Sequence, residues 1–382
     1  KPSVTEDFSS FYEFIMPERN EKAKGPFPGR VERVRKSLPG WSAAGALFFG
    51  RPSIRYLTGF TGSEGTLFVG AEGAALLVDG RYTTQAAEET SGIDVITCRD
   101  RQEGLVGFIR DRDLADLVFE SAALACDAYF GLLDALGGRV RLNPLGRELG
   151  GLRKIKEAQE IESIRRAAEI ASGALLAVLE TLGPGEREID AARRLEREME
   201  SRGSEGPSFE TIVVSGPKTA LPHGRPGPVP MAAGGFVVID FGAVVEGYAS
   251  DETCTVALGA PSPEQAKVYG VVKEAHDRAI ELVREGTPCR AVDEAAREWI
   301  DRAGFGAFFT HGTGHGVGLE VHEPPRISTR DDGVLEEGMV VTVEPGVYIP
   351  GKFGVRIEDL VVVKKEGCEI LSSVPKGLKI IS

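Results

Sequence analysis

The chain has 382 residues, of which 42% are hydrophobic and 27% are charged, and its formal net charge at pH 7 is −13. This length is sufficient for two domains with buried cores. The acidic balance argues against binding to nucleic acid or to an anionic membrane surface, and no apolar run approaches the roughly 18 residues of a membrane span. We therefore expect a soluble globular protein that binds neither nucleic acid nor membrane.

The cysteines indicate a reducing compartment. They are odd in number, scattered and free of CxxC pairs, which is typical of free buried thiols and not of a disulfide framework or a zinc site. Their positions are Cys98, Cys126, Cys254, Cys289 and Cys368. No signal-peptide pattern is visible at the start of the sequence. We expect a cytoplasmic location.

The first 150 residues divide into an extension and a domain. Over residues 1–29 an aromatic patch (FSSFYEFIM) precedes a charged stretch rich in Gly and Pro. This composition is typical of a poorly ordered arm, with docking on the body or on a partner as the alternative. Over residues 30–150, helical patterns such as VERVRKSL alternate with apolar runs such as GALFFG, which predicts an α/β layer domain.

Residues 151–382 contain a faint internal repeat with a period of about 103 residues, which becomes visible when the sequence is aligned with itself. GPGEREIDAARR, from Gly183, matches GTPCRAVDEAAR, from Gly286, and GFVVIDFG, from Gly235, matches GMVVTVEPG, from Gly338. A second strand is expected after each strand of this later match. It lies in GYASDETCTVALG after GFVVIDFG, and in GVRIEDLVVV after GMVVTVEPG. We therefore predict a pseudo-symmetric domain whose two halves face one cleft.

Histidines gather in the run HGTGHGVGLEVHEPP, which holds three of the five in the chain. A fourth, His223, lies in LPHGRP, and His276 lies in an ordinary helical pattern. The glycines of the run make a long helix improbable, so we expect a loop or short strand that directs imidazoles into a cleft. The alternative is a Gly-rich loop with solvated histidines.

Four acids occupy nearly equivalent places in the two halves of the repeat: Asp240 and Asp251 in the first, Glu344 and Glu358 in the second. Acids set among β-branched apolar residues are costly to bury alone, and four together would repel one another. Two divalent cations would balance them, with His315 as a nitrogen donor. This mixture suits manganese, cobalt, iron or zinc. The alternative is a set of strand-end acids paired with Lys or Arg.

An ordered set of motifs resembles a known family. LPHGRP, VIDFG, GYASDET, HGTGHGVGLEVHEPP, VEPGVY and GVRIED are similar to motifs of the pita-bread metallopeptidases, specifically the Xaa-Pro aminopeptidases (aminopeptidase P) and Xaa-Pro dipeptidases (prolidases). IRYLTGFTGSEG and VDGRYTTQA resemble the non-catalytic N-terminal domain of that group. From about residue 30 to the end, the resemblance implies an α+β fold: a creatinase-type, ribonuclease-H-like N-terminal domain, then a pseudo-symmetric pita-bread catalytic domain.

The resemblance also implies the residues of the site. The implied metal ligands are Asp240, Asp251, His315, Glu344 and Glu358. Two divalent ions are implied, manganese first, with cobalt, zinc or iron as alternatives, and Asp251 and Glu358 typically bridge them. Cys254 departs from the pattern, because many relatives carry Arg there.

The implied substrate-binding residues are His223, His311, His322 and Arg356. His223 and His322 would hydrogen-bond the carbonyls and the tetrahedral intermediate, and His311 would shape a proline pocket. Glu344 would accept a proton and pass it to the departing nitrogen. His223, His322 and Glu344 are thus the expected catalytic residues.

The resemblance implies an Xaa-Pro aminopeptidase, whose substrate is a peptide with proline at the second position. An Xaa-Pro dipeptidase is the nearest alternative. More distant ones are another hydrolase or a lyase on the same fold, and a peptide-binding pseudo-enzyme, which would lack ligands as creatinase does. The resemblance further implies a homodimer.

Overall fold

The structure is a computed structural model that describes residues 12–13 and 26–382. It forms two compact units, Lys1–Leu152 and Arg153–Ser382. Most of the predicted N-terminal arm lies outside the described residues. Its residues Tyr12–Glu13 form strand β1, which pairs antiparallel with strand β5 (Asp94–Cys98). Among the residues described, no helix is both long and apolar enough to cross a membrane.

The first unit is built on a mixed sheet with the order β1-β5-β4-β3-β2-β6-β7, counted over the described residues. Its other strands are β2 (Gly45–Phe48), β3 (Thr66–Gly70), β4 (Ala74–Asp79), β6 (Asp116–Glu120) and β7 (Arg141–Leu145). Its helices are α1 (Phe27–Ser37), α2 (Arg51–Thr58), α3 (Thr83–Glu89), α4 (Arg101–Asp111), α5 (Cys126–Leu136) and α6 (Arg147–Gly150).

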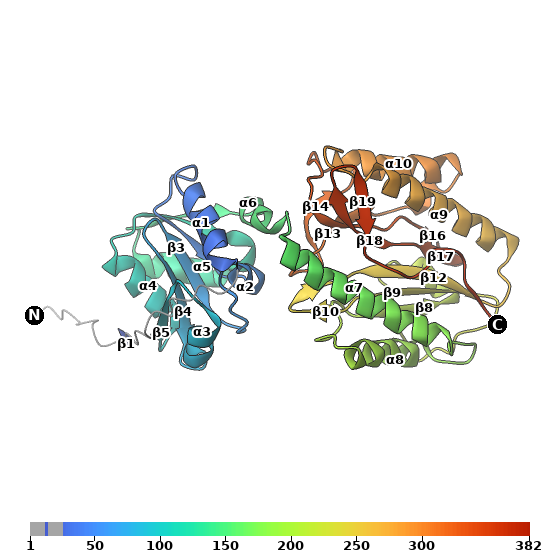
Figure 1. Ribbon diagram of the computed structural model, residues 1–382, viewed down its shortest axis with the longest axis horizontal. Coiled ribbons are helices and arrows are strands. Elements are labelled where there is room, and N and C mark those ends of the chain that lie inside the picture. Colours follow the sequence, from blue (N-terminus) through green and yellow to red (C-terminus); the bar gives the residue numbers. More distant parts are fainter. Residues whose placement is uncertain (1–11, 14–25) are drawn as a thin grey trace, which may run out of the picture. The chain divides into compact units, whose positions relative to one another are not determined.

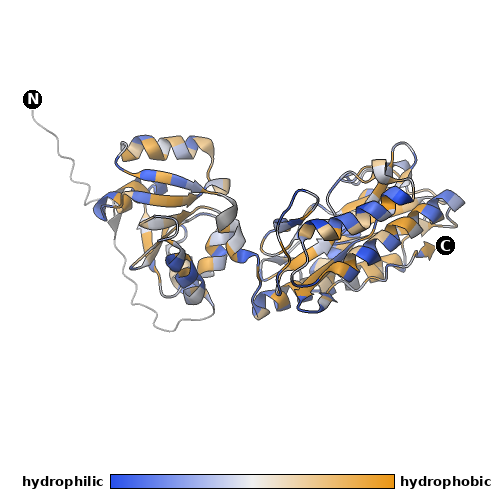
Figure 2. Ribbon diagram, turned by 90° about the horizontal axis from the view of Figure 1, so that it is seen from above, coloured by the Kyte–Doolittle hydropathy of each residue, from blue (hydrophilic) through white to orange (hydrophobic). Residues whose placement is uncertain are grey.

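Short apolar runs form the centre of this sheet. The run GALF becomes β2, and every residue of β2 and β3 is buried. Helix α4 contributes Leu105, Phe108 and Ile109 to the core that covers the sheet. Figure 2 shows hydrophobic residues concentrated in the strands, while the helices combine hydrophobic and hydrophilic positions. The α/β layering expected of this region follows from that pattern.

The second unit contains four long helices and two main sheets. The helices are α7 (Ala158–Leu179), α8 (Glu188–Ser201), α9 (Pro263–Leu282) and α10 (Cys289–Arg302). The strands of the first half are β8 (Ile212–Ser215), β9 (Phe236–Phe241), β10 (Val244–Val245), β11 (Tyr248–Ala249) and β12 (Glu252–Leu258). The later strands are β13 (Gly314–Gly316), β14 (Glu323–Ile327), β15 (Val340–Val343), β16 (Gly346–Ile349), β17 (Phe353–Arg356), β18 (Asp359–Lys364), β19 (Gly367–Ile370) and β20 (Ile380–Ile381).

The two halves of this unit repeat one arrangement. In the first half β9 pairs antiparallel with β12 and the hairpin β10–β11 lies between them in the chain. In the second half β15 pairs antiparallel with β18 and the hairpin β16–β17 lies between them. Helices α7 and α8 pack on the first sheet, and α9 and α10 pack on the second. The strands therefore lie between the two helix pairs (Figure 1).

The second strand of each half was expected to be continuous, and this expectation is wrong. The first is interrupted between β11 and β12, at Ser250 and Asp251, and the second between β17 and β18, at Ile357 and Glu358. At each break the chain changes its pairing partner, because β11 and β17 close a hairpin whereas β12 and β18 join the main sheet. Each break therefore coincides with one of the candidate acids.

Candidate functional site

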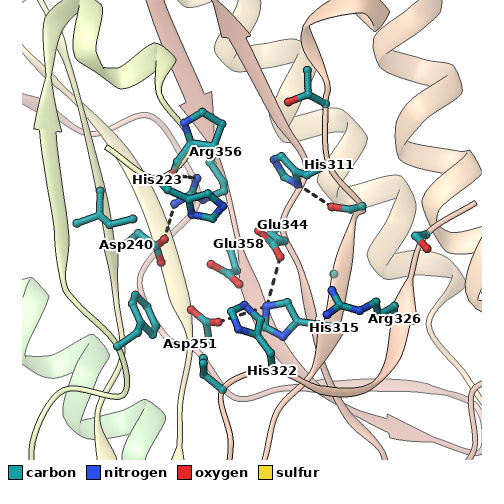
Figure 3. Close-up of a pocket in the computed structure, with 18 of the residues that line it drawn as sticks. His223, Asp240, Asp251, His311, His315, His322, Arg326, Glu344, Arg356 and Glu358 are labelled. Atoms are coloured by element: carbon teal, nitrogen blue, oxygen red, sulfur yellow. Dashed lines mark hydrogen bonds and ion pairs between the residues drawn. The ribbon is translucent and has the colours of Figure 1, made fainter. Parts of the chain in front are cut away.

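A pocket of about 1010 Å³ in the second unit brings together every site residue that the sequence singled out. The residues among its lining are His223, Asp240, Asp251, His311, His315, His322, Glu344, Arg356 and Glu358. In Figure 3 the acidic side chains and His315 point toward a common space. His311, His315 and His322 lie before, within and after strand β13, respectively. The other six residues come from both halves of the repeat.

The four acids occupy matching places in the two sheets. Asp240 is the next-to-last residue of β9, and Glu344 directly follows β15. Asp251 directly precedes β12, and Glu358 directly precedes β18. The four side chains thus reach one pocket from the end of the first strand and from the break in the second strand of each half.

Three donor atoms lie close enough together to bind one ion. One ligand atom each from Asp251, His315 and Glu358 lies within 4.8 Å of the others. The Nε2 atom of His315 lies 3.6 Å from a carboxylate oxygen of Asp251 and 3.4 Å from one of Glu344. A nitrogen and several carboxylate oxygens at these separations are a suitable donor set for a divalent transition metal.

Three of the acids, Asp251, Glu344 and Glu358, have raised pKa values in the metal-free protein. Burial, reinforced by the charge of Glu358, raises the pKa of Asp251 well above its usual range. Burial and the charge of Glu344 do the same to the pKa of Glu358, and burial raises the pKa of Glu344 to about 7. Buried carboxylates that face one another are destabilised by desolvation and by like-charge repulsion.

Asp240 supplies an independent indication that the residues fit bound cations. Arg356 forms an ion pair with its Oδ2 atom. Its Oδ1 atom is buried and receives no hydrogen bond from any residue that the structure describes. A buried carboxylate oxygen without a donor is rare and calls for a partner, which a metal ion would supply. The arrangement therefore fits a metal centre held by acids and one imidazole.

The imidazoles are held in the neutral form that coordination requires. Burial, followed by the neighbouring His322, lowers the pKa of His315 to about 3, and the two rings lie 4.3 Å apart. Burial also lowers the pKa of His311 to about 4. Burial and the charge of Arg326 lower the pKa of His322. At neutral pH the rings of His311 and His315 carry no charge. Nδ1 of His315 donates to the carbonyl of Gly316 at 3.1 Å, which leaves its Nε2 unprotonated and able to bind a metal.

A chain of hydrogen bonds joins two residues of the pocket lining, His311 and Arg356, to Tyr348 and Thr253. The hydroxyl of Tyr348 lies 2.9 Å from Nε2 of His311 and accepts a 3.0 Å hydrogen bond from Arg356. Arg356 also donates to the hydroxyl of Thr253 at 3.1 Å. Neither Tyr348 nor Thr253 was predicted as a site residue, although they lie inside the motifs VEPGVY and GYASDET.

Arg326 is a pocket residue that the sequence analysis missed. It lies on β14 opposite His315 on β13, and its side chain is exposed. Its backbone N–H donates to Asp331, whereas its guanidinium has no carboxylate partner in the described part of the chain. Its place four residues after His322, in the sequence HEPPR, was the available signal.

Cys254, where the sequence departs from the expected pattern, faces away from the pocket. It belongs to the core formed by α7, α8, β9 and β12. Burial raises the pKa of its thiol to about 12. The thiol is therefore neutral and packs as a small apolar group.

Two family models match the chain. Residues 162–365 match metallopeptidase family M24, and residues 30–155 match the creatinase/prolidase N-terminal domain. Among relatives, the Bacillus subtilis protein named Uncharacterized peptidase YqhT is 37% identical over 356 residues, which are 92% of this chain and 100% of the relative.

Two solved structures are similar over nearly their whole length. The Xaa-Pro dipeptidase from Bacillus anthracis is 36% identical with a TM-score of 0.89, covering 92% of this chain and 99% of that one. The X-Pro aminopeptidase from Thermotoga maritima is 37% identical with a TM-score of 0.85, again covering 92% and 99%.

Proposed function

Because the chain belongs to metallopeptidase family M24, we propose that it hydrolyses the peptide bond between an N-terminal residue and a following proline. The observation that carries this proposal is the convergence of five ligand-type side chains and three further histidines in one pocket. The names of the two similar structures support an Xaa-Pro substrate, since one is an Xaa-Pro dipeptidase and the other an X-Pro aminopeptidase.

Two divalent ions would be held by the acids and one imidazole, with manganese as our first choice and cobalt, zinc or iron as alternatives. The proposed ligands are Asp240, Asp251, His315, Glu344 and Glu358. When bound, such ions supply a water of lowered pKa and stabilise negative charge on a substrate oxygen. Four carboxylates carry more negative charge than Arg356 and one divalent ion together can offset, which supports two ions over one.

Glu344 is the proposed proton carrier. Its carboxylate lines the pocket and its pKa in the metal-free protein is raised by burial to about 7. A carboxylate beside the reacting atoms can take up a proton at one Oε and release it to the departing nitrogen in the same turnover. The departing nitrogen of proline needs such a proton, because in the peptide it is tertiary and carries none.

The histidines around the acids would hold the substrate. His223 and His322 are exposed within the pocket, so their N–H groups can donate to a substrate carbonyl oxygen as negative charge develops on it. His311 is fixed by Tyr348 and by the carbonyl of Gly312, 2.7 Å from its Nδ1. We assign His311 to the wall of the proline pocket and Arg356 to holding Asp240 in place.

The accepted peptide length separates two candidate functions. The sequence led us to expect an aminopeptidase, which tolerates residues after the proline. Arg326 favours an Xaa-Pro dipeptidase, because its guanidinium lines the pocket beside His322 and has no carboxylate partner among the described residues. The free carboxylate of a C-terminal proline would give this cation a partner, whereas a longer peptide places an uncharged amide there. We therefore rank the dipeptidase ahead on this observation.

The test is peptide cleavage by metal-stripped protein restored with manganese, cobalt, zinc or iron. Xaa-Pro dipeptides, Xaa-Pro-Yaa tripeptides and peptides without proline would be compared, with product masses recorded. Metal-dependent cleavage of the dipeptide alone supports the dipeptidase, and release of the first residue from the tripeptide supports the aminopeptidase. Cleavage of the peptides without proline at equal rates would refute the proposal. The homodimer and the cytoplasmic location stay predictions.

A further inference from the structure

Glu188 is a buried carboxylate outside the pocket that accepts four hydrogen bonds from one loop. It is the first residue of α8 and its relative exposure is 1%. Its Oε1 atom accepts from the backbone N–H of Ser215 at 2.8 Å and from the Ser215 hydroxyl at 3.0 Å. Its Oε2 atom accepts from Nζ of Lys218 at 2.7 Å and from the N–H of Gly227 at 3.0 Å.

These four donors come from both ends of the loop of residues 215–227, which carries His223. Ser215 is the last residue of β8, and Gly227 lies twelve positions later in the sequence. The N–H of Ile189, beside Glu188, also donates to the carbonyl of Gly227 at 3.1 Å. One carboxylate thus ties the start of the loop to its end and fixes both to a helix.

The ring of His223 depends on this loop for its position. The ring is exposed, it lines the pocket, and no hydrogen bond to it is present within the described residues. Inside the loop, the carbonyl of Pro222 accepts a 3.0 Å hydrogen bond from Arg356. A side chain that is not itself anchored lies where its backbone places it, so the accuracy of the His223 position follows from the anchoring of the loop.

The second half of the repeat anchors its own histidine loop in a comparable way. Asp293, on α10, is fully buried and accepts from the N–H and hydroxyl of Thr313 at 2.9 and 2.8 Å. Asp293 also pairs with Arg297, which donates to the carbonyl of His311 at 2.7 Å. Helices α8 and α10 carry the matching sequences GPGEREIDAARR and GTPCRAVDEAAR, although Asp293 aligns with Asp190 and not with Glu188.

We propose that Glu188 is a positioning residue, which fixes the loop of residues 215–227 and through it the ring of His223 in the peptidase pocket. The proposal rests on the proposed function for its catalytic consequence. A carboxylate is required because all four groups around it are donors. Glutamine would direct its NH₂ group at one pair of these donors and would lose the charge that pairs with Lys218.

The decisive experiment is a double-mutant cycle between Glu188→Gln and His223→Ala, measured as kcat/KM for an Xaa-Pro peptide. We expect Glu188→Gln to lower kcat/KM by about 10- to 100-fold, since a misplaced group costs that much without altering the chemistry. In the His223→Ala background, Glu188→Gln should lower kcat/KM by no more than about a further twofold, because both changes remove the same contribution. A loss in the double variant equal to the product of the two single losses would overturn the proposal.

Asp190→Asn is the matched control. Asp190 lies in the same first helical turn and pairs with Arg187 on the surface, without touching the loop. It controls for the loss of a negative charge at the N-terminus of α8. We expect kcat/KM to stay within about twofold of wild type for this variant. An equal loss in both variants would assign the effect to the helix and contradict the proposal.

Hydrogen–deuterium exchange tests the anchoring without using activity. Amides of residues 215–227 should exchange faster in Glu188→Gln and at the wild-type rate in Asp190→Asn, with manganese content unchanged in both. If Glu188→Gln does not fold, Ser215→Ala removes one of the four donors and should show a smaller change of the same kind. Unchanged exchange would overturn the proposal, whereas a wild-type protein without peptidase activity would overturn only the proposed function.

Discussion

The hydroxyl of Thr253 donates a 2.6 Å hydrogen bond to the carboxylate of Glu358. Thr253 belongs to the first half of the repeat and Glu358 to the second, 105 positions later in the chain. Both side chains are buried, so the bond is shielded from water. The position of one candidate metal ligand is therefore set by the half of the domain that does not contain it.

Replacing Thr253 with Val should weaken metal binding. The change leaves the Oε2 atom of Glu358 and the Nε atom of Arg356 without the hydroxyl that both now contact. We expect the free energy of unfolding to fall by about 1–3 kcal/mol, as for other buried groups left unsatisfied, and the affinity for manganese to fall with it. Urea denaturation and calorimetric titration with manganese measure the two effects.

Thr255→Val is the control for that substitution, because the bonds of the Thr255 hydroxyl go to the backbone of Arg356 and to no candidate ligand among the described residues. It should lose stability and keep its affinity for manganese. Equal affinities in wild type and Thr253→Val would show that the hydroxyl does not support the metal centre.

In metal-free protein, the stability that Glu344 contributes should be lost as the pH rises from about 4.5 to 7. Burial raises the pKa of Glu344 from 4.5 to about 7, so between these values the folded state binds more protons than the unfolded state. The stability that such a group contributes is complete below its pKa in the unfolded state. It is lost as the pH rises through its pKa in the folded state. The loss is about 3 kcal/mol for a shift of this size.

The measurement is urea denaturation of chelated protein across this pH range, with Glu344→Gln as the reference variant. Wild type should lose stability relative to the variant as the pH rises. Affinity for manganese should change in the opposite direction, increasing with pH, because binding requires ionised carboxylates. A constant difference between wild type and variant would contradict the raised pKa.

Arg326→Met should discriminate between substrates that differ only in their carboxyl end. A charge-assisted hydrogen bond contributes about 1.5–3 kcal/mol, so kcat/KM for an Xaa-Pro dipeptide should fall by about tenfold or more. The same dipeptide with an amidated C-terminus should be affected by less than about twofold, since it has no charge for Arg326 to pair with. Equal losses on both substrates would remove Arg326 from carboxylate recognition.

Lys376 should be essential for the stability of the second unit. Its Nζ lies 2.5 Å from Glu252 and 3.2 Å from Asp359, the residues that directly follow two candidate ligands. All three side chains are buried. Removing one partner of a buried charge cluster costs about 3–5 kcal/mol, which we expect for Lys376→Met in urea denaturation. The exposed Lys379, changed in the same way, should alter stability by less than about 0.5 kcal/mol.

The sequence alone predicted the fold class and located nine candidate site residues. A creatinase-type N-terminal domain followed by a pita-bread metallopeptidase domain is confirmed by the family models and by the solved structures. Asp240 and Glu344 could be found because a polar residue at the end of an apolar, β-branched run is a local signal that repeats 104 positions later. The histidine run was visible because three of the five histidines of the chain lie within fifteen residues. The roles of these residues stay predictions.

Only the tertiary structure decided which groups hold the candidate site residues in place. The break of each second strand at Asp251 and Glu358, the contact of Thr253 with Glu358, and the loop held by Glu188 are absent from any local pattern. The physical reason is that a buried polar group takes its partners from whichever strands and loops pack against it. Those neighbours are here dozens to more than a hundred positions away, where residue periodicity carries no information about contact.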